Sequence, residues 1–341
     1  MKAAIFYKKE DLRIEDIPVP EISDTEVLVK VHACGICGTD VHIFGGDEGA
    51  AATPPKTVLG HEFAGEIVKT GACVTDYSVG DRVCVDPNKL CNECFYCKSG
   101  TGHFCTHMTG IGTTVNGGFA QYCAVPVSQL YKFDSTLPYS HAAMTEPVAC
   151  CLHGTDLTNI SDSDTVAIIG GGMIGLIMLQ LAANCGANTL IMIEPVEEKR
   201  NLALKLGADI AVDPMHCDVK AELKARGIDR VTKVIECVGR TQTMEQAIDI
   251  AGNKATVMLF GLTAPADTVS IKPFEIFKKE LEIKASFINP YTQGRALDLI
   301  KKNKIDVSSM VHKIIPLSEL PRALSDPEMR RAGKIIVDPQ M

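Results

Sequence analysis

The sequence predicts an α/β protein with two domains, one of which is a doubly wound parallel sheet. Three observations support this fold class. A chain of 341 residues is long enough for two domains. Up to about residue 148, short strand-like runs are interrupted by glycine and proline. From about residue 160, short apolar runs alternate with helical stretches, a pattern typical of a parallel sheet.

The first part of the chain is mostly strand and turn. Residues Val27–Val31 form a run rich in β-formers, and Gly80–Val85 reads as a turn that leads into a strand. No long helical period occurs before about residue 140. We therefore expect a β-rich domain here.

The second part alternates strands with helices. Thr165–Ile169 is a continuous apolar run, as expected for a strand buried on both faces. The other expected elements are a helix from Ile174 to about Cys185, a strand Leu190–Ile193, a helix Glu197–Leu206, and strands Val231–Glu236 and Thr256–Phe260. This order implies a doubly wound sheet. From about residue 290 the pattern is mixed, and Lys334–Val337 is expected as a final strand outside this alternation.

Composition excludes some classes of partner. Hydrophobic residues make up 46% of the chain and charged residues 22%, as in an ordinary globular enzyme. The net charge of -8 disfavours nucleic acid and anionic membranes, which both require clustered basic residues. No signal-peptide pattern and no apolar run of about 18 residues is visible. We therefore expect a cytoplasmic protein, whose fourteen cysteines serve as ligands, catalytic groups or core residues rather than disulfides.

A glycine motif predicts a dinucleotide site. Gly170, Gly172 and Gly175 form G-x-G-x-x-G between a buried strand and a helix, with Met173 and Ile174 at the helix start. The glycines allow a tight turn, close approach of the pyrophosphate and close packing of the helix on the strand. The N–H groups at the helix start favour the phosphates. The alternative is a glycine-rich turn without a ligand.

The residues after the second strand bear on the choice of cofactor. Glu194 lies 19 residues after Gly175, the position of the acid that binds the ribose hydroxyls. A carboxylate there repels a 2′-phosphate, so NAD is favoured over NADP. Lys199 is a further candidate for the adenosine ribose, or else an ordinary surface lysine. Arg200 argues the other way, since an arginine can accept a 2′-phosphate.

Four cysteines predict a structural metal site. Cys91, Cys94, Cys97 and Cys105 have the spacing C-x₂-C-x₂-C-x₇-C, typical of a closed tetrahedral zinc site. The surrounding residues, about 88–108, contain little apolar material, so zinc would supply much of their folding energy. Free or redox-active cysteines and an iron–sulfur cluster are the alternatives.

The order of these motifs resembles a known family. Cys37 precedes the run from Gly60-His61-Glu62 through Gly71 to Val74, and Gly80-Asp81-Arg82-Val83 follows. With the four cysteines and the glycine motif, this resembles the zinc-containing medium-chain dehydrogenase/reductase family, in its sorbitol and threonine dehydrogenase branch. The resemblance implies a GroES-like catalytic domain at 1–148 and 290–341, with a Rossmann NAD-binding domain at 149–289.

The resemblance also implies a catalytic zinc and a proton path. Cys37, His61 and Glu62 match the family's zinc ligands, and Glu146 matches a glutamate that approaches the metal directly or through water. Cys150 and Cys151 are the rival ligands near Glu146. Thr39 matches the hydroxyl that takes the alcohol proton, and His42 matches the end of the relay towards solvent. Zinc acts as a Lewis acid on the alcohol oxygen, and hydride passes to the nicotinamide.

Three positions depart from the polyol-binding pattern of sorbitol dehydrogenase. Ile43, Ser286 and Phe287 stand where that enzyme has Tyr, Arg and Tyr. We expect the substrate to be a secondary alcohol that is a polyol, a sugar alcohol or a related compound. Because an apolar site discriminates only weakly between substrates, a less polar diol, an amino alcohol such as threonine, or a hydroxysteroid is the alternative. A catalytically inactive NAD-binding regulatory protein and a zinc-free quinone reductase are the remaining alternatives. The family commonly forms dimers or tetramers through its nucleotide domain.

Overall fold

The chain divides into two compact units. The computed structural model describes residues 1–47 and 52–341. One unit contains residues Met1–Ala149, Asn289–Asn303 and Val307–Met341, and the other contains Cys150–Ile288 and Lys304–Asp306. We call them unit 1 and unit 2. Among the described residues, no helix combines the length and the hydrophobicity needed to cross a membrane.

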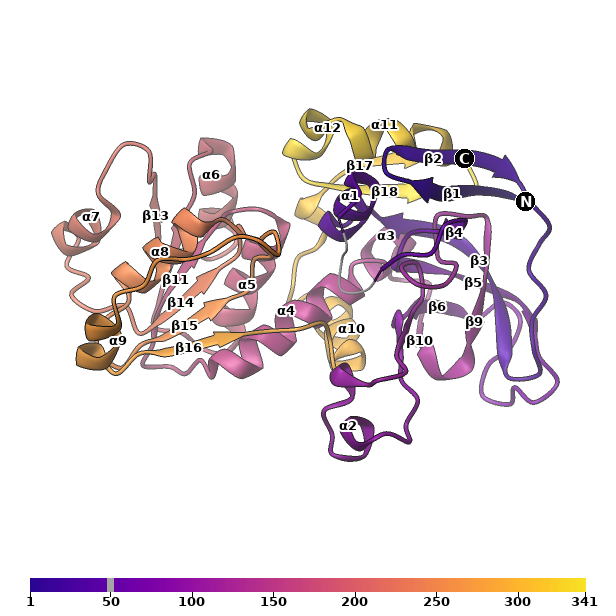
Figure 1. Ribbon diagram of the computed structural model, residues 1–341, viewed down its shortest axis with the longest axis horizontal. Helices are drawn as coiled ribbons and strands as arrows, with labels where there is room; N and C mark the ends of the chain where they lie inside the picture. Colours follow the sequence, from indigo (N-terminus) through magenta and orange to yellow (C-terminus); the bar gives the residue numbers. More distant parts are fainter. Residues whose placement is uncertain (48–51) are drawn as a thin grey trace. The chain divides into compact units, whose positions relative to one another are not determined.

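Unit 2 is built on a parallel sheet with strand order β13-β12-β11-β14-β15-β16 (Figure 1). This is the 3-2-1-4-5-6 order of dinucleotide-binding sheets, and it confirms the α/β fold class. The strands are β11 (Thr165–Ile169), β12 (Thr189–Ile193), β13 (Ile210–Val212), β14 (Lys233–Glu236), β15 (Thr256–Leu259) and β16 (Glu282–Ala285).

The helices of unit 2 connect these strands and cover the sheet. They are α5 (Met173–Asn184), α6 (Glu197–Lys205), α7 (Val219–Ala225), α8 (Thr241–Ile250) and α9 (Pro273–Lys279). Helix α4 (Thr145–Thr158) begins in unit 1 and ends in unit 2. The apolar core of unit 2 forms between the sheet and the helices, because central strands such as β11 are buried on both faces.

Unit 1 is mostly β-structure. Its main sheet has the order β10-β6-β5-β3-β18-β17, with β9 also paired to β3; β2-β1-β4 and β7-β8 form two small sheets (Figure 1). The strands are β1 (Lys2–Lys8), β2 (Asp11–Asp16), β3 (Glu26–Gly35), β4 (Thr57–Val58), β5 (Glu62–Thr70), β6 (Arg82–Val85), β7 (Asn88–Lys89), β8 (Thr109–Gly110), β9 (Tyr122–Pro126), β10 (Leu130–Phe133), β17 (Val311–Pro316) and β18 (Lys334–Asp338).

Apart from α4, the helices of unit 1 are short. They are α1 (Gly38–Gly45), α2 (Phe95–Lys98), α3 (Tyr139–Ala142), α10 (Gln293–Lys301), α11 (Leu320–Ser325) and α12 (Pro327–Arg331), with four 3₁₀ turns at Gly102–Phe104, Val127–Gln129, Ser308–Met310 and Leu317–Glu319 in the described residues. Strand β18, from the C-terminal end of the chain, pairs with β3 and places C-terminal residues beside the end of β3. This pairing matters for the site.

Candidate active site and metal centres

The four-cysteine lobe brings its sulfur atoms together. The Sγ atoms of Cys91, Cys94, Cys97 and Cys105 lie within 4.8 Å of one another. The Cys94–Cys97 separation is 3.5 Å and the Cys91–Cys97 separation 3.9 Å. Ligands at the usual zinc–sulfur distance in a tetrahedron are about 3.8 Å apart, so the set fits zinc. A hydrogen bond from the backbone N–H of Cys97 lowers the pKa of Cys94 to about 6, which favours the thiolate that binds metal.

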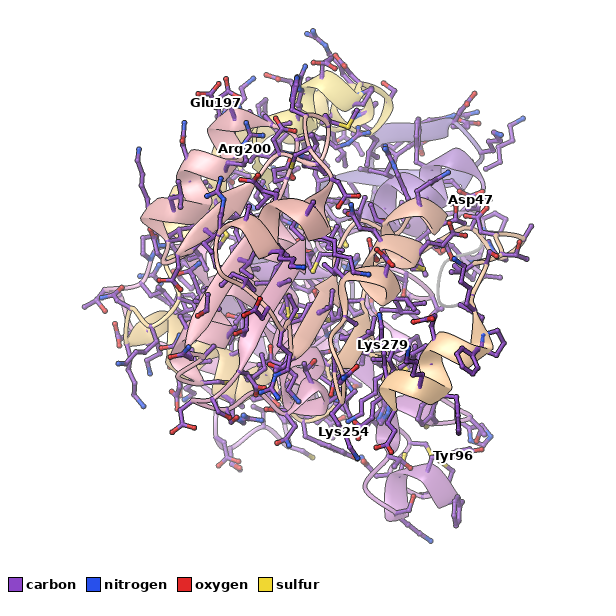
Figure 2. The ribbon with its side chains drawn as sticks, turned by 90° about the vertical axis from the view of Figure 1, so that its left-hand side faces the viewer. Asp47, Tyr96, Glu197, Arg200, Lys254 and Lys279 are labelled. Atoms are coloured by element: carbon purple, nitrogen blue, oxygen red, sulfur yellow. The ribbon has the colours of Figure 1, made fainter. Side chains whose placement is uncertain are left out.

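The lobe has little apolar core of its own. None of the residues of α2 is buried, and the side chain of Phe95 is 77% exposed. Figure 2 shows Tyr96 on the same short helix, at the outer end of the lobe. Backbone N–H groups point at the sulfurs instead: Cys94 donates to Cys91 Sγ at 3.4 Å, and His107 to Cys105 Sγ at 3.4 Å. The fold of this segment therefore depends on what its sulfurs bind.

A second cluster forms at the ends of β3 and β5. Ligand atoms of Cys37, His61 and Glu62 all lie within 4.8 Å of one another. Cys37 follows β3 and caps α1, while His61 and Glu62 stand at the start of β5. The antiparallel register pairs Gly35 with Glu62, so residues distant in the sequence meet where these two neighbouring strands end and begin. His61 and Glu62 are buried, whereas Cys37 is partly exposed.

Asp40 supports this cluster from α1. Its buried carboxylate accepts a hydrogen bond from the backbone N–H of Cys37 at 2.8 Å and lies 3.5 Å from His61 Nδ1. Burial alone would favour the neutral imidazole, but the charges of Asp40 and Cys37 raise the pKa of His61 well above its usual value. With Nδ1 facing Asp40, Nε2 is the ring nitrogen left for a metal, the arrangement common around zinc-binding histidines.

Unpartnered buried atoms test whether the residues fit a metal. In the described part of the chain, Glu62 Oε1, His61 Nδ1 and Asp40 Oδ1 are buried without a hydrogen-bond partner. Such atoms are costly unless something else satisfies them. The other oxygen of Glu62 accepts a hydrogen bond from Lys334 Nζ. The cluster offers one thiol, one imidazole and one carboxylate with an unsatisfied oxygen. This matches the ligand set of a catalytic zinc site with three protein ligands.

Neighbouring residues of α4 were also predicted to act at the metal. Glu146 lies in the first turn of α4 and is buried, with 8% of its surface exposed. Its ligation, direct or through water, stays a prediction. Cys151 belongs to unit 2, where its thiol is fully buried and lies 3.9 Å from the carbonyl oxygen of Ile174. Cys150 is partly buried. Core packing accounts for Cys151.

The relay residues lie on α1. Thr39 is partly exposed in its first turn. His42 Nδ1 lies 3.2 Å from Asp47 Oδ2, and both side chains face solvent, 44% and 63% exposed. A histidine with a carboxylate partner at the surface is suited to exchanging protons with water. The pairing with Asp47 was not predicted from the sequence.

The predicted pocket residues have different surroundings. Ile43 is 3% exposed and belongs to the apolar core of unit 1, so packing explains it without a substrate. Ser286 Oγ is buried and has no hydrogen-bond partner among the described residues. Phe287 is 36% exposed. Ile43 belongs to unit 1 and the other two to unit 2.

The glycine motif has a physical reason at each position. Gly170 has φ +100°, a left-handed conformation that glycine adopts readily. A Cβ atom on Gly175 would lie 1.8 Å from the carbonyl oxygen of Gly170. Nothing lies within 4 Å of the corresponding position on Gly172, the N-cap of α5, so a ligand has room to approach the backbone there. The turn leaves β11 next to β14, the switch point of the sheet, where nucleotides bind in this fold.

Glu194 is held behind this turn. It is 5% exposed, and its carboxylate accepts hydrogen bonds from the backbone N–H groups of Gly171 at 2.6 Å and Val196 at 2.9 Å. A Cβ atom on Gly171 would lie 2.9 Å from Glu194 Cγ, which explains the middle glycine of the Gly170–Gly172 run. The carboxylate therefore has a fixed place at the end of β12.

Arg200 is engaged by the protein itself. Its Nη1 atom donates to the carbonyl oxygens of Glu194 and Pro195, both at 2.8 Å, and lies 3.0 Å from Asp213 Oδ2. Figure 2 labels Arg200 and Glu197, which both come from α6. The guanidinium braces the loop that carries Glu194. Lys199, the preceding residue, is partly buried on the same helix.

Comparisons with known proteins place the chain in a family. Residues 23–135 match the alcohol dehydrogenase GroES-like domain, and residues 173–302 match the zinc-binding dehydrogenase domain. D-arabitol-phosphate dehydrogenase of Enterococcus avium is 36% identical, over 89% of this chain and 87% of that protein. D-arabinitol dehydrogenase 1 of Uromyces fabae is 32% identical, over 99% and 97%.

Solved structures agree with this placement. A protein from Sinorhizobium meliloti 1021, described as a zinc-binding dehydrogenase and bound to NADP, has a TM-score of 0.95 and 38% identity, with 99% of each chain covered. Galactitol-1-phosphate dehydrogenase from Escherichia coli has a TM-score of 0.90 and 28% identity, covering 99% of this chain and all of that one.

The chain belongs to the zinc-containing medium-chain dehydrogenase/reductase family. It is thus an oxidoreductase of the alcohol dehydrogenase type, which acts on CH–OH groups with a nicotinamide cofactor and zinc. The predicted family, fold class and reaction class are confirmed, and the inactive regulatory protein and the zinc-free branch are not needed to explain the chain.

Two supporting residues were missed from the sequence. Asp40 and Lys334 both contact the Cys37–His61–Glu62 cluster but are not themselves in the predicted ligand set. Asp40 had a signal, since an acid three residues after a helix N-cap often completes a capping box. Lys334 had none, because a lysine at the start of an apolar run resembles an ordinary strand end.

Proposed function

We propose that this protein transfers hydride between the CH–OH carbon of a polyol or related secondary alcohol and NAD. The observation that carries the proposal is the buried cluster of Cys37, His61 and Glu62, which leaves Glu62 Oε1 unsatisfied. A mostly buried site with one thiol, one imidazole and one carboxylate suits a metal that keeps a position open for substrate. The four cysteines would hold a second, structural zinc.

The chain's own residues would bind, orient and deprotonate the substrate. Zinc, held by Cys37, His61 and Glu62, would supply Lewis-acid polarisation of the alcohol oxygen. Thr39 would accept the hydroxyl proton at Oγ1 and release its own hydroxyl proton along the relay to His42. His42 would pass a proton to water, with Asp47 as the partner of its imidazole. Glu146 would adjust the metal environment from the start of α4. The nucleotide domain would hold the nicotinamide against the reacting carbon.

The cofactor preference is proposed to rest on Glu194. Its carboxylate is the negative group at the end of β12, and Arg200 is already bound by Glu194 O, Pro195 O and Asp213. A 2′-phosphate would therefore meet a fixed negative charge with no unengaged guanidinium from Arg200 beside it. The similar Sinorhizobium meliloti protein is bound to NADP, so the preference needs a direct test.

Glu194→Ala is expected to relax the preference for NAD over NADP by about tenfold or more, because two close charges repel by several kcal/mol at low dielectric. Dissociation constants for NADH and NADPH, measured by fluorescence titration, give the ratio. Glu197→Ala, which removes an exposed carboxylate from the first turn of α6, is the control and should leave the ratio unchanged. An unaltered ratio in Glu194→Ala would assign the preference to another residue.

A panel of alcohols tests the substrate class. NADH formation would be followed with sorbitol, xylitol, arabitol, a phosphorylated arabitol, threonine, 2,3-butanediol and a hydroxysteroid. Relatives with names such as D-arabitol-phosphate dehydrogenase and D-altritol 5-dehydrogenase favour a polyol. Turnover of one polyol supports the proposal and makes Ile43 and Ser286 compatible with hydroxylated substrates. Turnover of only an apolar secondary alcohol would move the enzyme to the second candidate class.

The assembly and compartment are part of the proposal. We infer a homo-oligomer, a dimer or tetramer, formed through unit 2. Strand β16 is an edge of the six-stranded sheet, and the nearby helix α9 exposes Phe274 (67%) and Phe277 (77%). Exposed strand edges and apolar patches favour association. No disulfide joins cysteines in the described part of the chain, which fits a reducing, cytoplasmic location.

A further inference from the structure

A buried lysine lies against the carboxylate of the proposed zinc ligand. Lys334 begins β18, and its side chain is 3% exposed. Its Nζ atom donates to Glu62 Oε2 and, at 2.9 Å, to the carbonyl oxygen of Ile36. Glu62 is fully buried. A buried ion pair of this kind loses several kcal/mol when one partner is removed, because the other charge stays buried without compensation.

Gly35 makes room for this pair. It lies on β3, paired with Glu62 of β5 on one side and with Ile336 of β18 on the other. A Cβ atom there would lie 2.2 Å from Glu62 Oε2 and 2.7 Å from Lys334 Cε. The φ of Gly35 is not positive, so the backbone conformation does not require glycine. The missing side chain instead leaves the space in which lysine and glutamate meet.

The two oxygens of Glu62 have different partners. Oε2 accepts a hydrogen bond from Lys334, whereas Oε1 is buried without a hydrogen-bond partner. A carboxylate oxygen of Glu62 lies within 4.8 Å of the ligand atoms of Cys37 and His61, so Oε1 is the oxygen left for a metal. The cluster also contains the buried carboxylate of Asp40. Two buried carboxylates repel one another unless cations lie close to them. His61 lies beside Asp40, and Lys334 is the cation that contacts Glu62.

We propose that Lys334 is the permanent counter-ion of Glu62: it holds Oε2, leaves Oε1 for zinc, and lets the site fold before zinc arrives. This inference rests on the proposed zinc site. Its consequence is that the wild-type protein gains only modest stability from the catalytic zinc, since Glu62 already has a cation. Without Lys334, zinc becomes the cation that Glu62 requires, and folding of unit 1 becomes coupled to zinc.

The test is the melting temperature with and without the catalytic zinc. Each protein would be treated with a chelator until metal analysis finds about one zinc per chain, retained by the four-cysteine lobe. Lys334→Met is expected to lose about 10 °C more than the wild type on this treatment. The double variant Lys334→Met/Glu62→Gln is expected to regain most of that loss, because it buries no charge at this position. Lys313→Met is the control and should behave as wild type. Lys313 lies on β17, the strand next to β18, and its substitution breaks an exposed ion pair with Glu319.

Two results would overturn the inference: an equal loss for Lys334→Met and wild type, or a double variant no more stable than the single one. Lys334 would then only fill space. If Lys334→Met does not fold at all, a folded double variant supports the charge argument, and an unfolded one contradicts it. This comparison of melting temperatures needs no assay of activity, so it tests the ion pair separately from the proposed function. The proposed function fails if zinc-loaded wild-type protein oxidises no alcohol.

Discussion

Replacing Cys37 with serine is expected to abolish alcohol oxidation while NAD binding stays intact. The thiol is one of three side chains whose ligand atoms lie within 4.8 Å of one another. Loss of the metal removes Lewis-acid stabilisation of several kcal/mol, so turnover should fall by about a thousandfold or more. The nucleotide-binding turn lies in unit 2 and does not include Cys37. Steady-state kinetics and an NADH titration on the same preparation measure both quantities.

Cys73→Ser is the matched control for this variant. Cys73 is exposed and is not one of the residues in either predicted metal cluster. We expect its substitution to leave both turnover and zinc content unchanged. Undiminished turnover in Cys37→Ser would show that the catalytic zinc is held elsewhere or is not used.

Replacing Cys94 with serine is expected to unfold the lobe formed by residues 88–108. Structural zinc contributes roughly 10 kcal/mol to the folding of such segments, and α2 has no buried residue to compensate for its loss. Zinc content should fall by one ion per chain, and limited proteolysis should cut within the lobe. Lys98→Ala changes an exposed residue of the same helix and should leave the lobe intact. A Cys94→Ser protein that resists proteolysis as wild type does would disprove a zinc-dependent lobe.

The parallel sheet was predictable where its strands are buried on both faces. Thr165–Ile169 was expected and observed with the same bounds, because a central strand reads as a continuous apolar run. Strand β14 begins at Lys233 rather than at the expected Val231. Strand β16, Glu282–Ala285, was not expected, since an edge strand with mostly exposed residues carries no apolar run.

The two metal clusters differ in how far the sequence alone could define them. The four cysteines lie within fifteen residues, so their spacing was sufficient. Cys37 could be linked to His61 and Glu62 only through the family resemblance, because the register of β3 with β5 brings them together. Lys334 lies 272 residues after Glu62, and only the pairing of β18 with β3 makes them neighbours.

The cofactor site shows a third case. Glu194 and Arg200 were both visible from the sequence, but with opposite implications for the 2′-phosphate. The hydrogen bonds of Arg200 to Glu194 O and Pro195 O depend on how the loop after β12 folds, which composition and spacing do not determine. Side-chain partners that are fixed by loop geometry are the least predictable part of this site.

The central claim is that one of two bound zinc ions is required for hydride transfer. The most direct measurement is zinc content together with NAD-dependent oxidation of the preferred alcohol, on one preparation before chelation, after it, and after zinc is restored. We predict about two zinc ions per chain, loss of turnover with the more readily removed ion, and recovery when it returns. Full turnover in protein stripped of that ion would contradict the account.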